Sequence, residues 1–130
     1  MRVLALDYGS ARCGCAVSDP TGTLATPIEA VEQPRSKRGM ARLEALVRER
    51  EVERVVVGLP VSLSGEDSDQ TREARAFADA LRGRLGKQIP IEMYDERFTT
   101  AIAARAGGST TSEDSRAAAV LLEDWLVRHG

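Results

Sequence analysis

Acidic residues stand where apolar segments of this chain end or begin, and Asp7 is the first of them. It ends the short apolar run Val3-Leu4-Ala5-Leu6, which has the character of a buried strand. Gly9 leaves the backbone beside it open, so that a phosphate or a metal ion could approach closely. Because an aspartate at the end of a strand is also a common turn residue, Asp7 alone does not define a site.

A second pair of acids, Asp95 and Glu96, follows the apolar segment Ile89–Tyr94, and Arg97 comes directly after it. Side chains alternate between the faces of a strand, so only one of the two acids can point toward a given face. The pattern is compatible with a surface ion pair, which stabilises little. It is equally compatible with one metal-ligating carboxylate beside an arginine that contacts phosphate, and the sequence does not say which acid is the ligand.

Asp114 belongs to the apolar stripe of the last helix. Its spacing to Ala118, Leu121 and Trp125 is i, i+4, i+7 and i+11, so the four residues share one helical face. A carboxylate in the first turn of a helix interacts favourably with the helix dipole. An acid that faces the core nevertheless needs a partner, and a metal ion would be one.

Carboxylates that converge without countercharges repel one another, so such a cluster indicates hard cations such as Mg²⁺ or Mn²⁺. Two such ions activate a water and stabilise the leaving oxygen in phosphodiester cleavage.

Histidine- and cysteine-dependent chemistries have little support in the sequence. The single histidine, His129, lies next to the C-terminus, and Cys13 and Cys15 are expected on one face of a strand as reduced packing residues. Two cysteines without nearby partner ligands are also a weak zinc site.

The elements that must position these acids follow from the change of hydrophobic period along the chain. We expect three strands joined by short turns, then alternating helices and strands, with a short helix that begins at Thr99 or Thr100 and ends at Arg105. The predicted strands are Val3–Leu6, Gly14–Ser18, Thr23–Val31, Val55–Val57 and Ile89–Tyr94. The other predicted helices are Lys37–Glu51, one with the stripe Ala74, Phe77, Ala78, Leu81 and Leu85, and Glu113–Val127.

This order predicts an α/β protein with a five-stranded mixed sheet, an antiparallel meander followed by parallel crossovers, and helices on both faces. The 130 residues fit a single domain, 1–130. No apolar run approaches the roughly 18–20 residues needed to span a bilayer, and we expect a cytoplasmic protein. The net charge of −2 does not indicate nucleic-acid binding, but phosphate binding needs only a local basic surface.

Taken together, the motifs resemble the YqgF/RuvX family along essentially the whole chain. The block Asp95-Glu96-Arg97-Phe98-Thr99-Thr100 is the most specific of them. The others are Leu6-Asp7-Tyr8-Gly9 to Arg12-Cys13-Gly14, Val17-Ser18-Asp19, Val57-Gly58-Leu59-Pro60 and Asp114-Ser115-Arg116-Ala117-Ala118.

The resemblance implies a ribonuclease H-like fold and a divalent-metal nuclease that processes the 5′ end of pre-16S ribosomal RNA; an older alternative for the family is cleavage of Holliday junctions. The implied catalytic residues are Asp7, Asp95 or Glu96, and Asp114, and the metal set we assign is Asp7, Glu96 and Asp114, with Mg²⁺ or Mn²⁺ as the ions. The implied residues for substrate or structural support are Arg12, Arg97 and Thr99.

One departure from the family pattern concerns substrate binding. Members carry a longer, basic stretch before the last motif, whereas Gly107–Glu113 here is short and contains no basic residue. If that stretch holds nucleic acid in the family, binding here must depend on basic residues elsewhere. The candidates are Arg35, Lys37, Arg38 and Arg42, or Arg72 and Arg75.

Two other kinds of protein compete with the nuclease. The first is a non-catalytic nucleic-acid or phosphate-binding module on the same fold, because the turn at Asp7 and Gly9 resembles the phosphate turns of sugar kinases and Hsp70-type ATPases. Those proteins need two such domains and a second phosphate loop. The second is a protein-interaction domain, in which the acids would be solvated surface residues without a catalytic role. Strict metal dependence of any activity would argue against it. Junction resolvases act as dimers because a junction has two-fold symmetry, so both a monomer and a homodimer remain open.

Overall fold

Five strands form one mixed sheet in the order β3-β2-β1-β4-β5. The computed structural model describes residues 1–59, 69–95 and 113–129. The first three strands make an antiparallel meander, and β4 and β5 join β1 in parallel, as the sequence predicts. The strands are β1 (Val3–Tyr8), β2 (Arg12–Ser18), β3 (Ala25–Glu32), β4 (Arg54–Leu59) and β5 (Ile91–Asp95).

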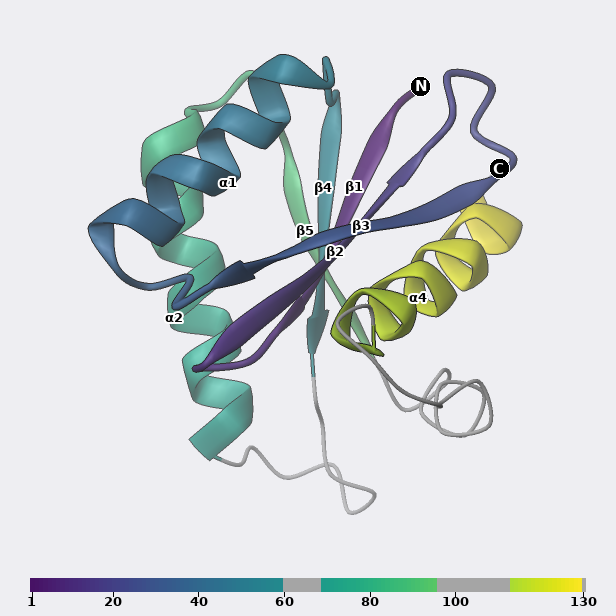
Figure 1. Cartoon of the computed structure of the whole chain (residues 1–130). Coiled ribbons are helices and arrows are strands. Elements are labelled where there is room, and N and C mark those ends of the chain that lie inside the picture. Colours follow the sequence, from purple (N-terminus) through teal and green to yellow (C-terminus); the bar gives the residue numbers. More distant parts are fainter. Residues whose placement is uncertain (60–68, 96–112, 130) are drawn as a thin grey trace.

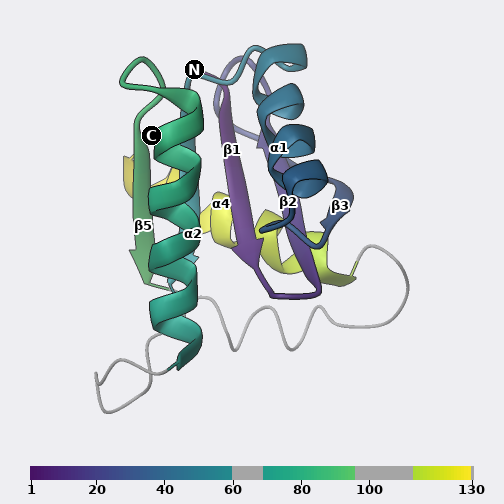
Figure 2. The same ribbon diagram turned by 90° about the vertical axis from the view of Figure 1, so that its left-hand side faces the viewer.

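Helices cover both faces of this sheet (Figure 1). The helices α1 (Lys37–Glu49) and α2 (Asp69–Leu85) pack on one face, and α4 (Glu113–His129) crosses the other. Figure 2 shows α1 and α2 side by side on one side of the sheet, with α4 behind it. The predicted α/β architecture with helices on both faces is confirmed.

The strand β1 is apolar from Val3 to Leu6 because it is buried on both faces of the sheet. Leu4 and Leu6 belong to the core beneath α1 and α2, whereas Val3 and Ala5 belong to the core beneath α4. A central strand that is buried on both faces has no solvent side on which polar residues could alternate. The first polar side chain of the strand is therefore Asp7, near the carboxyl end of the strand.

Several predicted boundaries were wrong by a few residues. The strand β4 continues through Gly58 and Leu59, which pair with Tyr94 and Asp95 of β5, so the glycine does not end the strand. Proline has no N–H to donate to a ladder, and β5 begins after Pro90, whose carbonyl accepts the Val55 N–H at 3.0 Å.

The first helix also differs from its prediction, because α1 ends at Glu49 rather than at Glu51, which has a φ of 53°. The short helix predicted from Thr99 or Thr100 to Arg105 lies outside the described residues.

Both cysteines are free, buried and part of the core beneath α1 and α2, as expected for reduced packing residues on one face of β2. Among the helices that the structure describes, none has the length and apolar character needed to cross a bilayer.

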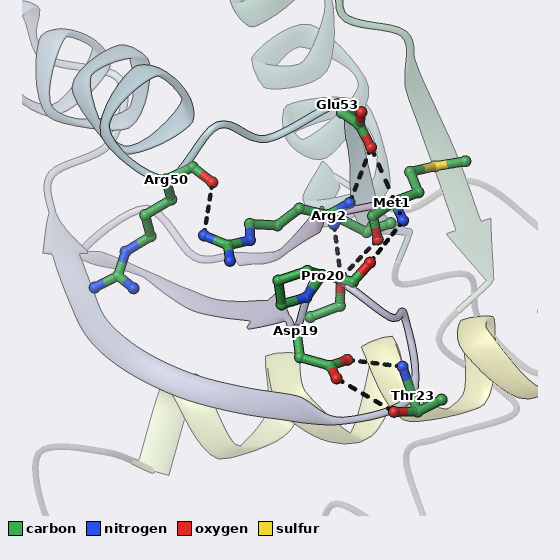
Figure 3. A network of polar contacts seen from close by, with 9 residues as sticks. Met1, Arg2, Asp19, Pro20, Thr23, Arg50 and Glu53 are labelled. Atoms are coloured by element: carbon green, nitrogen blue, oxygen red, sulfur yellow. Dashed lines mark hydrogen bonds and ion pairs between the residues drawn. The ribbon is translucent and has the colours of Figure 1, made fainter.

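The amino ends of β1 and β4 are joined by a polar network (Figure 3). The Arg2 N–H donates to the Glu53 carboxylate at 3.1 Å, and the Arg2 guanidinium donates to the Arg50 carbonyl at 3.0 Å. The Met1 amino group donates to the Pro20 carbonyl at 3.0 Å. These bonds satisfy backbone groups at the strand ends and tie the β2–β3 turn to the start of β1.

The β2–β3 turn is organised by Asp19, which makes the stability of the fold depend on acidity. Its carboxylate accepts the N–H groups of Leu24 and Thr23 at 3.0 and 2.8 Å, and it also accepts the Thr21 hydroxyl. The Leu24 N–H, followed by the Thr21 hydroxyl and the Thr23 N–H, holds the pKa of Asp19 well below its usual range.

We expect Asp19→Ala to lower the thermal midpoint more at pH 7 than at pH 3. A depressed folded-state pKa stabilises the fold above the unfolded value of about 4, and this stabilisation is lost as the pH falls toward the folded value. Thermal unfolding of both proteins at the two pH values measures the difference. An equal loss at pH 7 and pH 3 would contradict the prediction.

Candidate active site

The carboxyl ends of four strands meet at one edge of the sheet. Because β2 alone runs against its neighbours, β1, β3, β4 and β5 all end on the same side. We call this side the carboxyl edge. It carries Asp7 at the end of β1 and Asp95 at the end of β5, so two of the four predicted acids come to the same edge from different strands.

Asp7 lies between two glycines on the face that α4 covers. Val3 and Ala5 point into the core beneath α4, and strand alternation puts Asp7 on the same face. On one side Asp7 pairs with Gly14 of β2. On the other side, Leu6 pairs with Val57, so the next residue of β4, Gly58, lies beside Asp7. Neither neighbour projects a side chain over the half-buried carboxylate, which leaves room for a ligand.

The loop that follows Asp7 is held close to the start of β2. A Cβ atom on Gly9 would lie 2.7 Å from the carbonyl oxygen of Arg12, closer than real Cβ atoms come to backbone. Only glycine therefore fits at this point without a shift of the chain. From the sequence, Gly9 is expected to give a ligand access, and in the structure it also permits a tight β1–β2 connection.

The amino end of α4 is anchored beside Asp7 by Ser115. Its hydroxyl is buried and accepts the Cys15 N–H at 3.3 Å, at a place where the pairing of β2 with β3 shifts register. Cys15 follows Gly14, the partner of Asp7, so the first turn of α4 is fixed at this end of the sheet. No pattern in the sequence indicates this role of Ser115.

Asp114 directly precedes Ser115 in that first turn, and its side chain lies outside the described residues. The rest of its predicted stripe is confirmed, since Ala118, Leu121 and Trp125 are all buried in the core between α4 and the sheet. The backbone thus brings the position of Asp114 to the region of Asp7.

Asp95 and Asp7 belong to opposite faces of the sheet. Met93 packs against the core beneath α1 and α2, and Tyr94 packs against the core beneath α4. Alternation then gives Asp95 the face of Met93. The other predicted residues of this motif, Glu96, Arg97 and Thr99, lie outside the described residues.

Tyr94 shares the α4 face with Asp7, and its hydroxyl donates to the carboxylate of Asp124 on α4. Burial and this hydrogen bond raise the pKa of Tyr94 to about 12, so the phenol stays protonated at neutral pH. His129 stacks on Trp125 with ring centroids 4.6 Å apart and meets the ring of Tyr94 edge-on. These groups attach the carboxyl half of α4 to β5.

Arg12, one of the predicted substrate contacts, lies at the start of β2 on the carboxyl edge. Its guanidinium Nε is 3.2 Å from a carboxylate oxygen of Glu32, and both side chains are more than half exposed. An exposed ion pair of this kind is weak and leaves the arginine accessible from solvent.

Asp7 is the one member of the assigned metal set whose side chain the structure describes, since Glu96 and Asp114 fall outside that description. The described side chains contain no cluster of three metal-ligating residues. Oxygen donors such as Asp7 suit Mg²⁺ and Mn²⁺, and the glycines on both sides of it leave space for an ion.

Comparison with known sequences extends over nearly the whole chain. The sequence model of the RuvX family, described as Holliday junction resolvase, matches residues 1–128. A relative from Mycobacterium leprae (strain Br4923), named "Putative pre-16S rRNA nuclease", is 41% identical over 133 residues, which cover 96% of this chain and 72% of the relative. A relative from Rhodococcus erythropolis with the same name is 44% identical, over 96% of this chain and 77% of its own length.

Solved structures share the fold at low sequence identity. Thermus thermophilus RuvC in complex with a Holliday junction substrate has a TM-score of 0.66 and 17% identity, over 100% of this chain and 97% of that one. The fowlpox virus Holliday junction resolvase has a TM-score of 0.60 and 12% identity, over 98% and 99% of the two chains. These neighbours confirm the predicted ribonuclease H-like fold. With its motifs, its sheet and its sequence relatives in agreement, this chain belongs to the RuvX family.

Proposed function

We propose that this protein is a divalent-metal-dependent nuclease that processes the 5′ end of pre-16S ribosomal RNA in the cytoplasm. The observation that carries the proposal is the placement of Asp7, a half-buried carboxylate at the carboxyl edge between Gly14 and Gly58. The names of the sequence relatives supply the substrate.

In this proposal Asp7, Glu96 and Asp114 hold the metal. The faces of β5 favour Glu96 over Asp95 as the second acid, because Asp95 belongs to the face opposite Asp7 and Glu96 is the next residue along the chain. The anchor between Ser115 and Cys15 supports Asp114 as the third. Bound Mg²⁺ or Mn²⁺, as one or two ions, would lower the pKa of a water and stabilise the leaving oxygen of the phosphodiester.

The chain's own residues would position the substrate around that centre. The glycines next to Asp7, Gly14 and Gly58, leave room for a phosphate at the carboxylate, and the core beneath α4 excludes water from its inner side. Arg12 and Arg97 would neutralise phosphate charge, and Thr99 would donate a hydrogen bond to the substrate or to the loop.

Cleavage of four-way DNA junctions is the second candidate, favoured by the description of the family model and by the fold shared with RuvC. A resolvase would work as a homodimer, since a junction presents two equivalent strands. A monomer in solution would favour RNA processing.

We expect the protein to cleave an RNA that carries the 5′ leader of 16S rRNA when Mg²⁺ or Mn²⁺ is present, and to be inactive with EDTA. The same reactions on a synthetic four-way junction separate the two candidates. Cleavage of the junction with the RNA left intact would establish the resolvase instead. Failure to cut either substrate with either metal would overturn the nuclease and leave a binding module.

A further inference from the structure

Three basic side chains gather where β3 turns into α1, and we call residues 33–38 the β3–α1 corner. Arg35, Lys37 and Arg38 are all exposed there, and none forms an ion pair with another residue that the structure describes. Two of the other basic candidates form ion pairs, Arg42 with Glu49 and Arg72 with Asp69. The corner therefore holds three uncompensated positive charges in a chain of net charge −2.

The corner lies beside the loop that follows Asp7. The strand β3 ends at the carboxyl edge, and the Gln33 N–H donates to the Ala11 carbonyl of the β1–β2 loop at 2.8 Å. Arg35 lies near Tyr8, the residue that follows Asp7. The positive charges and Asp7 thus border the same stretch of chain.

The backbone of the corner is held in one shape. The Ser36 hydroxyl caps α1 by accepting the Gly39 N–H at 2.9 Å, and the Ser36 N–H donates to the Gln33 carbonyl at 3.0 Å. Gly39 packs so closely on the corner that a Cβ atom would lie 2.2 Å from the Gln33 oxygen and 2.7 Å from the Pro34 Cα. The three charges are presented from a rigid support.

The placement of these charges does not stabilise the helix. Lys37 and Arg38 are in the first turn of α1, which contains no acidic residue, and the amino end of a helix disfavours positive charge. Fold stability thus gives no reason for basic residues here. An anion bound at the corner would compensate both the helix end and the side chains.

We propose that the β3–α1 corner binds the sugar-phosphate backbone of the nucleic acid next to the phosphodiester that is cleaved. The exposed, spread-out charges fit an extended polyanion, and their place beside the Asp7 loop fits a strand that continues past the metal site. This inference rests on the proposed nuclease function. It also supplies the basic surface that the short stretch Gly107–Glu113 lacks.

The test is binding of a fluorescent single-stranded leader RNA and of a four-way junction, by anisotropy in EDTA across a range of salt concentrations. The variant is Arg35→Gln/Lys37→Gln/Arg38→Gln. The matched control, Arg48→Gln/Arg50→Gln/Lys87→Gln, removes three charges at the carboxyl end of α1 and at the α2–β5 loop.

We expect the corner variant to raise Kd at least about tenfold near 100 mM salt and to reduce the salt slope by about two units, with the control close to wild type. Its melting temperature should equal or exceed that of wild type, because the amino end of α1 loses unfavourable charges. Lys37→Gln alone should give a smaller loss in the same direction and serves if the triple variant folds poorly.

Equal losses in the corner variant and the control would overturn the corner as a specific surface, and so would no loss in either. Because binding is read without cleavage, the two proposals fail separately. An intact corner effect in a protein that cuts neither substrate would refute the nuclease alone. Unchanged binding in an active enzyme would refute the corner alone.

Discussion

Asp7→Asn is expected to abolish nuclease activity while leaving the fold and nucleic-acid binding in place. The substitution keeps the size of the side chain and removes the negative charge that would hold the metal. Loss of a group that merely orients a metal ligand costs about 10–100-fold, so loss of a ligand itself should cost more. The measurement is the cleavage rate of leader RNA at saturating Mg²⁺ and Mn²⁺, with binding measured separately in EDTA.

The matched control for this substitution is Asp79→Asn on the outer face of α2. Asp79 is 73% exposed and pairs with Arg82, on a helix that covers the sheet face opposite that of Asp7. We expect its activity to match wild type. Activity of Asp7→Asn within tenfold of the control would show that the carboxylate of Asp7 is not a metal ligand.

Phe77→Ala is expected to destabilise the protein by about 3–5 kcal/mol, the usual cost of emptying a buried aromatic site. Phe77 is fully buried on α2, and its ring stacks on that of Tyr8 with centroids 4.6 Å apart. Since single domains have only about 5–15 kcal/mol of stability, this is a large fraction. Urea unfolding at neutral pH, followed by circular dichroism, measures the change.

The control is Leu24→Ala, which removes a large apolar side chain that is 67% exposed on the β2–β3 turn. Little burial is lost there, so its stability should stay within about 0.5 kcal/mol of wild type. A loss below about 1 kcal/mol for Phe77→Ala would mean that the contact between α2 and the end of β1 contributes little to the fold.

Much of the sheet could be predicted because apolar periodicity reports burial directly. The meander, the two parallel crossovers and the buried stripes of α2 and α4 follow from local patterns. Strand boundaries were less predictable where a residue type that usually ends a strand is kept in the strand by pairing with a neighbouring strand. Gly58 and Leu59 extend β4 because β5 lies alongside them, and that partner is distant in sequence.

For the candidate site, the sequence indicates residue types but not their arrangement. Asp7 was identified from its place at the end of an apolar strand, and the structure puts it at the edge where strands converge. The proposed preference for Glu96 over Asp95 rests on the faces of Met93 and Tyr94, which no local pattern of β5 gives. The role of Ser115 depends on a register shift in β2, which is separated from β5 by the two strands β1 and β4.

That register shift makes one backbone amide a reporter on α4. The Cys15 N–H bonds to the Ser115 side chain of α4, at the point where the pairing of β2 with β3 shifts register. Its hydrogen exchange should therefore follow detachment of the helix rather than opening of the sheet. Slower exchange of this single amide on addition of metal or nucleic acid would show that a ligand at the carboxyl edge tightens the helix that carries Asp114.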